Sequence, residues 1–305
     1  MITSHLIIQN NENTIEEALN SISSFSHQIL VADIGSSDKT PEICKKYHAE
    51  IIKLSLNNDL SQVRNNLLKH SKNELNFWIE PWESVIQWEN YEETVRCNII
   101  NGTNIHKSIR FWKNLKFRNP VYETLKGNAK NSEIYIKTNF INNNERNLRL
   151  IKSWQERSPL ALEPYYYLSC ILLSQNKWKE FINIANYFIF QEKRQTMAVI
   201  MTKYYLSGVY FHIEKDYQKA INLLMNCIIL KPLMAEFWCL LGDIYYELDK
   251  YDKAICFYEN AIILGSRRLN SDEWPFEITK YKNYPETMIE NCKKIKNSIK
   301  TIYKI

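Results

Sequence analysis

Two stretches in the second half of the sequence repeat each other. LSGVYFHIEKDYQKAINLL, residues 206–224, aligns with LLGDIYYELDKYDKAICFY, residues 240–258, at an offset of 34 residues. Both copies place a glycine in their first part, Gly208 and Gly242, then an aromatic residue and an alanine at matching positions. Small residues let two helices approach closely, so this pattern indicates stacked helix pairs. The second half of the chain is therefore expected to be entirely helical.

A weaker copy of the same pattern lies earlier, at residues 168–185, with a spacing that is five residues longer. The dipeptide Lys231-Pro232 ends one helix pair before the next, because proline cannot continue a helix. The period and the positions of the small and aromatic residues resemble the tetratricopeptide repeat. We expect residues 148–305 to form a tetratricopeptide-repeat solenoid, in which an apolar helix beyond Gly265 is a C-terminal cap rather than a membrane or partner helix.

The first half of the sequence alternates short apolar runs with helical patterns. Strands are expected at 5–9, 28–33, 50–54 and 74–80, and helices at 14–25, 40–47 and 60–70. Strands that alternate with helices of about ten residues form βαβ units and a largely parallel sheet. Two later extended stretches, 103–112 and 133–141, are expected to be antiparallel edge strands. Residues 1–147 are thus predicted to be an α/β domain with a Rossmann-type, mostly parallel sheet.

Composition narrows the classes of function. The net charge of +5 is spread along the chain, which disfavours nucleic-acid binding. The seven cysteines show no CxxC or Cys/His ligand spacing, so structural zinc is not expected. The N-terminus lacks the basic region of a signal peptide, and no apolar stretch reaches the roughly 18 residues that a membrane span needs. We expect a soluble, cytoplasmic protein.

Five stretches of the first half, taken in order, resemble family 2 glycosyltransferases. They are IIQNNENTIEEALNSI (7–22), VADIGSSDKTPEIC (31–44), NDLSQVRNNLLKHS (58–71), FWIEPWESV (77–85) and SIRFWKNLKFRNPVYETL (108–125). The second is similar to the Asp-x-Gly-Ser-x-Asp-x-Thr motif of that family. Peptide S-glycosyltransferases of the sublancin type resemble this chain further, because they also carry a tetratricopeptide tail.

The resemblance implies a GT-A fold whose nucleotide-sugar donor lies at the carboxyl ends of the strands. Asp33 would accept hydrogen bonds from the base, Glu12 would hold the ribose hydroxyls, and Arg64 would support the diphosphate. The alternative for Arg64 is a surface salt bridge. The other residues that the resemblance assigns to the donor site are Glu80, Trp82 and Tyr122. The alternative for Asp33 is that it only fixes the turn that follows its strand.

The metal-site motifs of the family are degenerate here. The Asp-x-Asp position reads Glu80-Pro81-Trp82, and an indole can only donate a hydrogen bond. Glu80 and Glu83 are the candidate ligands for Mn²⁺ or Mg²⁺, since hard cations take oxygen ligands. The alternative is a metal-independent site in which cationic side chains neutralise the diphosphate.

The His-Glu pair of the family is replaced by Tyr122-Glu123. Glu123 is then the candidate catalytic residue, as an acid/base or an acceptor-orienting group.

Two functions follow from these patterns. The first is a hexosyltransferase-like enzyme that moves a sugar from a nucleotide-activated donor to a peptide, protein or glycan acceptor held partly by the repeats. The second is a catalytically inactive GT-A-like scaffold or partner subunit. It would act through its tetratricopeptide repeats, by pairing with a companion glycosyltransferase or by self-association.

Overall fold

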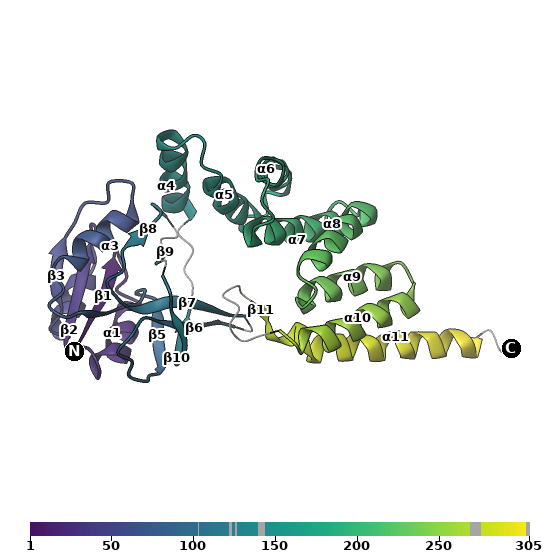
Figure 1. Cartoon of the computed structure of the whole chain (residues 1–305), viewed down its shortest axis with the longest axis horizontal. Coiled ribbons are helices and arrows are strands. Elements are labelled where there is room, and N and C mark those ends of the chain that lie inside the picture. Colours follow the sequence, from purple (N-terminus) through teal and green to yellow (C-terminus); the bar gives the residue numbers. More distant parts are fainter. Residues whose placement is uncertain (103, 122–123, 126, 140–143, 269–275, 303–305) are drawn as a thin grey trace. The chain divides into compact units, whose positions relative to one another are not determined.

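The computed structural model describes residues 1–102, 104–121, 124–125, 127–139, 144–268 and 276–302. The chain forms two compact units, and the division lies between Arg157 and Ser158 (Figure 1). The predicted boundary at residues 147 and 148 falls inside helix α4 (Asn144–Arg157), which belongs to the first unit.

The first unit begins with the predicted alternation of strands and helices. The strands are β1 (Ile2–Ile8), β2 (Gln28–Asp33), β3 (Glu50–Lys53) and β4 (Leu75–Trp78). The helices between them are α1 (Ile15–Ser23), α2 (Thr40–Lys46) and α3 (Leu60–Leu68). The four strands pair in parallel in the order β3-β2-β1-β4, so the predicted βαβ architecture is confirmed.

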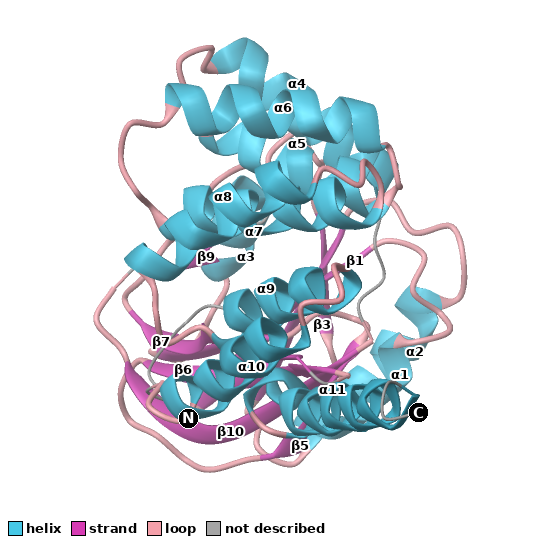
Figure 2. Ribbon diagram, turned by 90° about the vertical axis from the view of Figure 1, so that its right-hand side faces the viewer, coloured by secondary structure: helices cyan, strands magenta, loops and turns pink. Residues whose placement is uncertain are grey.

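The sheet continues beyond β4 with strands that run in both directions. They are β7 (Asn104–Lys113), β6 (Val95–Asn101), β10 (Lys130–Thr138) and β5 (Glu83–Gln87), in that order outward from β4. Figure 2 shows β7, β6 and β10 side by side. A short ribbon of β8 (Phe117–Arg118) and β9 (Thr124–Leu125) lies apart from this sheet.

The described parts of the predicted extended stretches 103–112 and 133–141 lie mostly in β7 and β10, but their expected edge position is wrong. β7 lies between β4 and β6, and β10 lies between β6 and β5. The reason is that the strands predicted from the sequence did not include β5 and β6, which cover their outer sides. The alternation of these two strands is blurred by polar residues, for example in VRCNIIN of β6.

The core of the first unit lies between α1 and the sheet. Every residue of β1 is buried, and the inward face of α1 contributes Ile15, Ala18, Leu19 and Ile22. A strand buried on both faces reads as a nearly continuous apolar run, because crossover helices cover the sheet. This explains why HLII was recognisable as a strand from the sequence.

The second unit is a succession of antiparallel helices. They are α5 (Glu163–Ser174), α6 (Trp178–Gln191), α7 (Met197–His212), α8 (Tyr217–Leu230), α9 (Ala235–Glu247) and α10 (Tyr251–Gly265). The chain continues through β11 (Phe276–Glu277) and η1 (Ile278–Tyr281) into α11 (Asn283–Ile302). Each helix packs against the next from α5 to α10, as a helical-repeat array requires.

The repeat seen in the sequence coincides with these helix pairs. α8 begins at Tyr217 and α10 at Tyr251, which are equivalent positions of the two copies. Helix α11 packs against α10, where Ile289 and Cys292 are buried beside Tyr258. The predicted solenoid is therefore confirmed, and α11 occupies the position at which the capping helix is expected.

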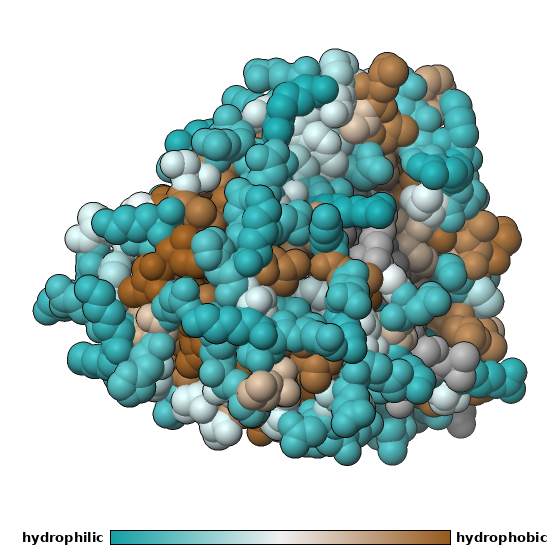
Figure 3. Space-filling view, turned by 60° about the vertical axis from the view of Figure 1, so that its left-hand side comes forward, coloured by the Kyte–Doolittle hydropathy of each residue, from teal (hydrophilic) through white to brown (hydrophobic). Residues whose placement is uncertain are grey.

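Hydrophilic side chains cover most of the face shown in Figure 3, with smaller apolar patches among them. Among the helices of the described residues, none combines the length and apolar character that a bilayer crossing requires.

The two repeat glycines give a matched test of helix packing. A Cβ at Gly242 would lie 2.6 Å from the ring of Tyr258, whereas a Cβ at Gly208 would have no atom within 4 Å. We expect Gly242→Ala to lower the free energy of unfolding by about 1–3 kcal/mol through overpacking. Gly208→Ala should instead leave it unchanged or raise it by up to about 1 kcal/mol, because alanine favours the helix. Urea unfolding followed by circular dichroism measures both, and equal effects would contradict this account of the packing.

His5 gives a pH-dependent test of the first unit. Burial lowers the pKa of His5 from 6.5 to about 4, although its hydrogen bond to Asn76 opposes the shift. The unfolded chain therefore binds a proton at a higher pH than the folded chain does. We expect the free energy of unfolding to fall by about 3 kcal/mol between pH 6.5 and 4 on account of this residue. Urea unfolding of His5→Gln at several pH values should show a smaller fall over this range, and an identical fall would contradict the assignment.

Candidate functional site

Three predicted site residues lie at one edge of the sheet. β2, β1 and β4 are adjacent parallel strands, so their carboxyl ends meet at the same edge. Asp33 is the last residue of β2 and pairs in register with Ile8 at the end of β1. Glu12 follows β1 by four residues, and Glu80 follows β4 by two. In open α/β sheets this edge is where ligands bind.

Asp33 holds the turn between β2 and α2. Its Oδ1 atom accepts hydrogen bonds from the backbone N–H groups of Gly35, at 3.1 Å, and Ser36, at 2.8 Å. The turn needs a glycine because the φ angle of Gly35 is +113°. Asp33 is only 5% exposed. The turn-fixing role expected as its alternative is therefore present in the structure.

Glu12 and Asp38 link the loop after β1 to the start of α2. The Oε2 atom of Glu12 accepts from the backbone N–H of Lys39 at 3.1 Å, and the N–H of Glu12 donates to Oδ2 of Asp38 at 3.1 Å. Oδ1 of Asp38 accepts from the N–H and the hydroxyl of Thr40. Burial acts to raise the pKa of Asp38, but the hydrogen bonds from Thr40 and Glu12 outweigh it, so the pKa is lowered. These bonds fix the positions of both loops at the sheet edge.

Arg64 reaches the end of β4 from the middle of α3. Asp59 caps this helix by accepting from the backbone N–H of Gln62 at 3.2 Å. The guanidinium of Arg64 is buried and lies 2.5 Å from Oε1 of Glu80. It also lies 4.3 Å from the centre of the Trp78 ring, within the range of a cation–π interaction.

Glu83 and Arg110 form a second, more deeply buried ion pair. Both oxygens of Glu83 accept from the guanidinium of Arg110, at 2.8 and 2.9 Å, and both residues are about 5% exposed or less. Glu83 also accepts from the backbone N–H of Glu80 at 2.9 Å. The Arg110 guanidinium lies 3.5 Å from the centre of the Trp78 ring. We call Arg64, Trp78, Glu80, Glu83 and Arg110 the arginine–tryptophan cluster.

Sequence reasoning missed Arg110, which has a central place in this cluster. Its signal was a charged residue inside the otherwise apolar run IRFW of β7. A buried charge needs a partner of opposite sign, so a buried arginine at this position requires a buried carboxylate. The sequence alone does not say that Glu83 is that carboxylate, because the two residues meet only through the pairing of the strands.

The predicted metal ligands are engaged by these arginines. Glu83 uses both carboxylate oxygens on Arg110, and Glu80 uses Oε1 on Arg64. Across the described ranges, no three His, Cys, Asp or Glu side chains are grouped so that they could hold a metal ion. As they are arranged, Glu80 and Glu83 do not fit a divalent cation. The expectation of Mn²⁺ or Mg²⁺ at these residues would require both ion pairs to open.

Of the three remaining predicted residues, the structure describes Trp82. Trp82 is partly buried, and its backbone carbonyl accepts from the N–H of Asn139 at 3.2 Å. Tyr122 and Glu123 lie outside the described residues.

The ion pair between Glu83 and Arg110 can be tested by a double-mutant cycle. We expect Glu83→Gln to lower the free energy of unfolding by about 3–5 kcal/mol, because it leaves the Arg110 charge buried without a counter-charge. The double variant Glu83→Met with Arg110→Met should lose much less free energy of unfolding than the sum of the losses in Glu83→Met and Arg110→Met alone. Urea unfolding followed by tryptophan fluorescence measures each variant. A loss below about 1 kcal/mol in Glu83→Gln would mean that the pair behaves like an exposed one.

Comparison with known proteins finds one family match, which lies in the first unit. Residues 5–80 match the family model described as glycosyl transferase family 2. No curated protein matches the chain.

Solved structures that resemble the chain include three proteins with distant similarity. MamA from Desulfovibrio magneticus RS-1 (residues 41 to the end) is 20% identical, with a TM-score of 0.40, over 53% of this chain and 82% of that one. PcrH from Pseudomonas aeruginosa is 14% identical, with a TM-score of 0.37, over 43% and 91%. The Sgt2 TPR domain from Aspergillus fumigatus is 13% identical, with a TM-score of 0.36, over 46% and 82%.

The helical repeat rests on the chain's own packing, in which each helix from α5 to α10 contacts the next. The segment 5–80 contains the edge formed by β2, β1 and β4. The chain therefore combines an N-terminal unit, of which residues 5–80 match the glycosyl transferase family 2 model, with a C-terminal array of helix pairs that resemble tetratricopeptide repeats.

Proposed function

We propose that this protein is a hexosyltransferase-like glycosyltransferase that binds a nucleotide-activated sugar at the edge formed by β2, β1 and β4. The observation that carries the proposal is the position of Asp33, Glu12 and Glu80. All three lie at adjacent carboxyl ends of parallel strands, inside the segment that matches the family model. The acceptor is a peptide, protein or glycan that the helical repeats help to bind.

In this proposal, Asp33 serves both the turn and the nucleotide. Both turn hydrogen bonds end on Oδ1, and Oδ2 is the atom that we assign to the base. The carboxylate is held in place by the turn before any ligand arrives, which lowers the entropic cost of binding. Glu12 is exposed beside the start of α2 and is assigned to the ribose.

Departure of a nucleoside diphosphate needs positive charge close to its oxygens. Glu80 and Glu83 are already neutralised by guanidinium groups, so we propose that the donor site works without a divalent cation. Arg64 is assigned to the diphosphate, whose oxygens would replace Glu80 as the partner of its guanidinium, while the Trp78 ring keeps the guanidinium in place. Trp82 and Tyr122 are assigned to the donor and Glu123 to the acid/base role, on the family resemblance alone.

A second candidate is a GT-A-like scaffold that binds a companion glycosyltransferase, or a second copy of itself, through the repeats without catalysing transfer. The engagement of both candidate metal ligands favours it. The two candidates differ in one measurable property, the release of nucleoside diphosphate by the isolated chain.

The donor site is tested by calorimetry with UDP-glucose, UDP-N-acetylglucosamine and GDP-mannose, in the presence of Mn²⁺ or of EDTA. We expect at least one of these to bind equally well in both conditions. Asp33→Asn keeps an oxygen for the turn but loses the negative charge, so the affinity should fall about tenfold or more. Asp252→Asn, on the surface of α10, is the matched control and should bind as the parent does.

Two results would contradict the proposed site. One is the absence of binding across the three sugar nucleotides, and the other is an unchanged affinity in Asp33→Asn. Binding that needs Mn²⁺ would contradict only the proposal that the donor site works without a divalent cation. Binding without release of diphosphate, when candidate peptide acceptors are present, would favour the scaffold over the enzyme.

A further inference from the structure

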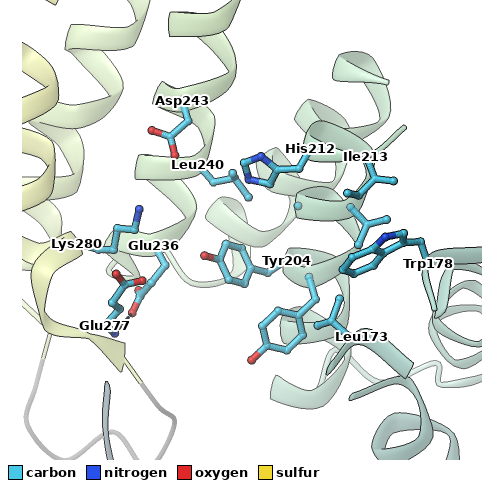
Figure 4. A pocket seen from close by; sticks show the side chains of 13 residues that line it. Leu173, Trp178, Tyr204, His212, Ile213, Glu236, Leu240, Asp243, Glu277 and Lys280 are labelled. Atoms are coloured by element: carbon cyan, nitrogen blue, oxygen red, sulfur yellow. Dashed lines mark hydrogen bonds between the residues drawn. The ribbon is translucent and has the colours of Figure 1, made fainter. Parts of the chain in front are cut away.

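The helical unit contains a pocket of about 400 Å³. Its walls come from α5, α7, α9 and the first residue of α6, together with Glu277 and Lys280 (Figure 4). One end is apolar and is formed by Leu173, Trp178 and Ile213, whereas the other end carries Glu236, Glu277 and Lys280. The volume is within the range of sites that bind ligands. The pocket is lined by residues of this unit alone, so it shares no residue with the sheet edge assigned to the donor.

The pocket owes part of its space to a difference between two equivalent repeat positions. At Gly242, the ring of Tyr258 packs so closely that an added Cβ would lie 2.6 Å away. At Gly208, which lines the pocket, an added Cβ would meet nothing within 4 Å. The repeat position of Tyr258 is occupied in the earlier copy by the smaller Leu224. The glycine at 208 is therefore not needed for helix packing, and it leaves open space in the wall of the pocket.

The charges of the pocket are not balanced. Its carboxylates are Glu236, Asp243 and Glu277, and its cation is Lys280. Lys280 compensates one of these three carboxylates. Arg268 lies 3.5 Å from Glu236 and compensates that one. With these five side chains ionised, one negative charge remains. Burial raises the pKa of Glu236 and of Asp243, so a cationic occupant would also stabilise their charged forms. Burial lowers the pKa of His212 below its usual value, so this lining residue is neutral at pH 7 and does not supply the missing charge.

The carboxylates are held rigidly at this end. Oδ1 of Asp243 accepts from the hydroxyls of Tyr258 and Tyr284, both at 2.7 Å. Glu236 accepts from the hydroxyl of Tyr281 at 2.8 Å and from the backbone N–H of Glu277 at 3.0 Å. Such a fixed negative surface favours a cation and disfavours an anion such as a sugar nucleotide. The rings of Tyr204 and Trp178 line the same pocket and can contact the apolar part of an occupant.

We propose that this pocket binds an extended peptide segment, with an apolar side chain at the Trp178 end and one lysine or arginine side chain at the carboxylate end. The surplus negative charge is matched by one cationic group of the occupant. Residues i and i+2 of an extended chain lie on one side, about 6.6 Å apart, so both side chains can enter the same pocket. This inference rests on the proposed role of the repeats in holding an acceptor or partner, and it names the chemistry of what they hold.

The test uses the full chain without any nucleotide and three fluorescein-labelled peptides on a Gly/Ser scaffold. They carry Leu-Ser-Arg, Leu-Ser-Glu or Ser-Ser-Arg at the centre. We expect fluorescence anisotropy to show the tightest binding for Leu-Ser-Arg, and at least about tenfold weaker binding for each of the other two. No binding of Leu-Ser-Arg at about 1 mM, or equal binding of Leu-Ser-Glu, would overturn the proposal.

Two variants locate the binding in the pocket. Gly208→Phe should fill the open space and weaken binding of the Leu-Ser-Arg peptide about tenfold or more. Asn222→Phe places the same side chain on the exposed surface of α8 and is the matched control, with no change expected. Glu277→Gln removes one charge and should weaken the Arg peptide while leaving the Glu peptide unchanged or improved. It therefore tests the pocket even if circular dichroism shows that Gly208→Phe does not fold.

Failure of the peptide-binding proposal can be distinguished from failure of the proposed donor site. Sugar-nucleotide calorimetry on Gly208→Phe should give the parent's affinity, because the pocket and the sheet edge lie in different units. Donor binding without peptide binding would overturn the inference and leave the proposed transferase intact. An unaltered affinity of the Leu-Ser-Arg peptide in both Gly208→Phe and Glu277→Gln would place the peptide elsewhere and overturn the pocket assignment.

Discussion

Burial of β1 on both faces is the constraint on which the first unit depends. The strand lies between β2 and β4, and all of its residues are buried. A central strand of this kind needs helices over the sheet, and helices over the sheet require crossover connections between parallel strands. Parallel strands in turn bring their carboxyl ends to one edge, where polar loops can meet. The position of Asp33, Glu12 and Glu80 is a consequence of this packing.

Charge burial shapes the same edge. Arg64 and Arg110 are both buried, and each has a glutamate partner and lies against Trp78. Removing a guanidinium from water is costly unless a carboxylate compensates it. The carboxylates of Glu80 and Glu83 are therefore engaged by Arg64 and Arg110. This is the physical reason for proposing a donor site that does not depend on a metal ion.

The helical unit shows how one repeat pattern serves two purposes. Gly242 allows Tyr258 to pack closely and to hold Asp243 through its hydroxyl. Gly208, at the equivalent position, borders open space. The same residue type thus lies against an aromatic ring in one copy and lines a pocket in the other.

The sequence by itself determined the architecture of this protein. The period of 34 residues, the apolar runs and the helical spacing were sufficient for the solenoid and for the parallel half of the sheet, because these patterns are local. It also placed Asp33 and Glu80 at strand ends. The tertiary structure alone decided that β7 and β10 are interior strands, that Arg110 faces Glu83, and that Gly208 opens into a pocket. These features depend on which residues meet across large sequence separations, and a single sequence carries no periodic signal for such contacts.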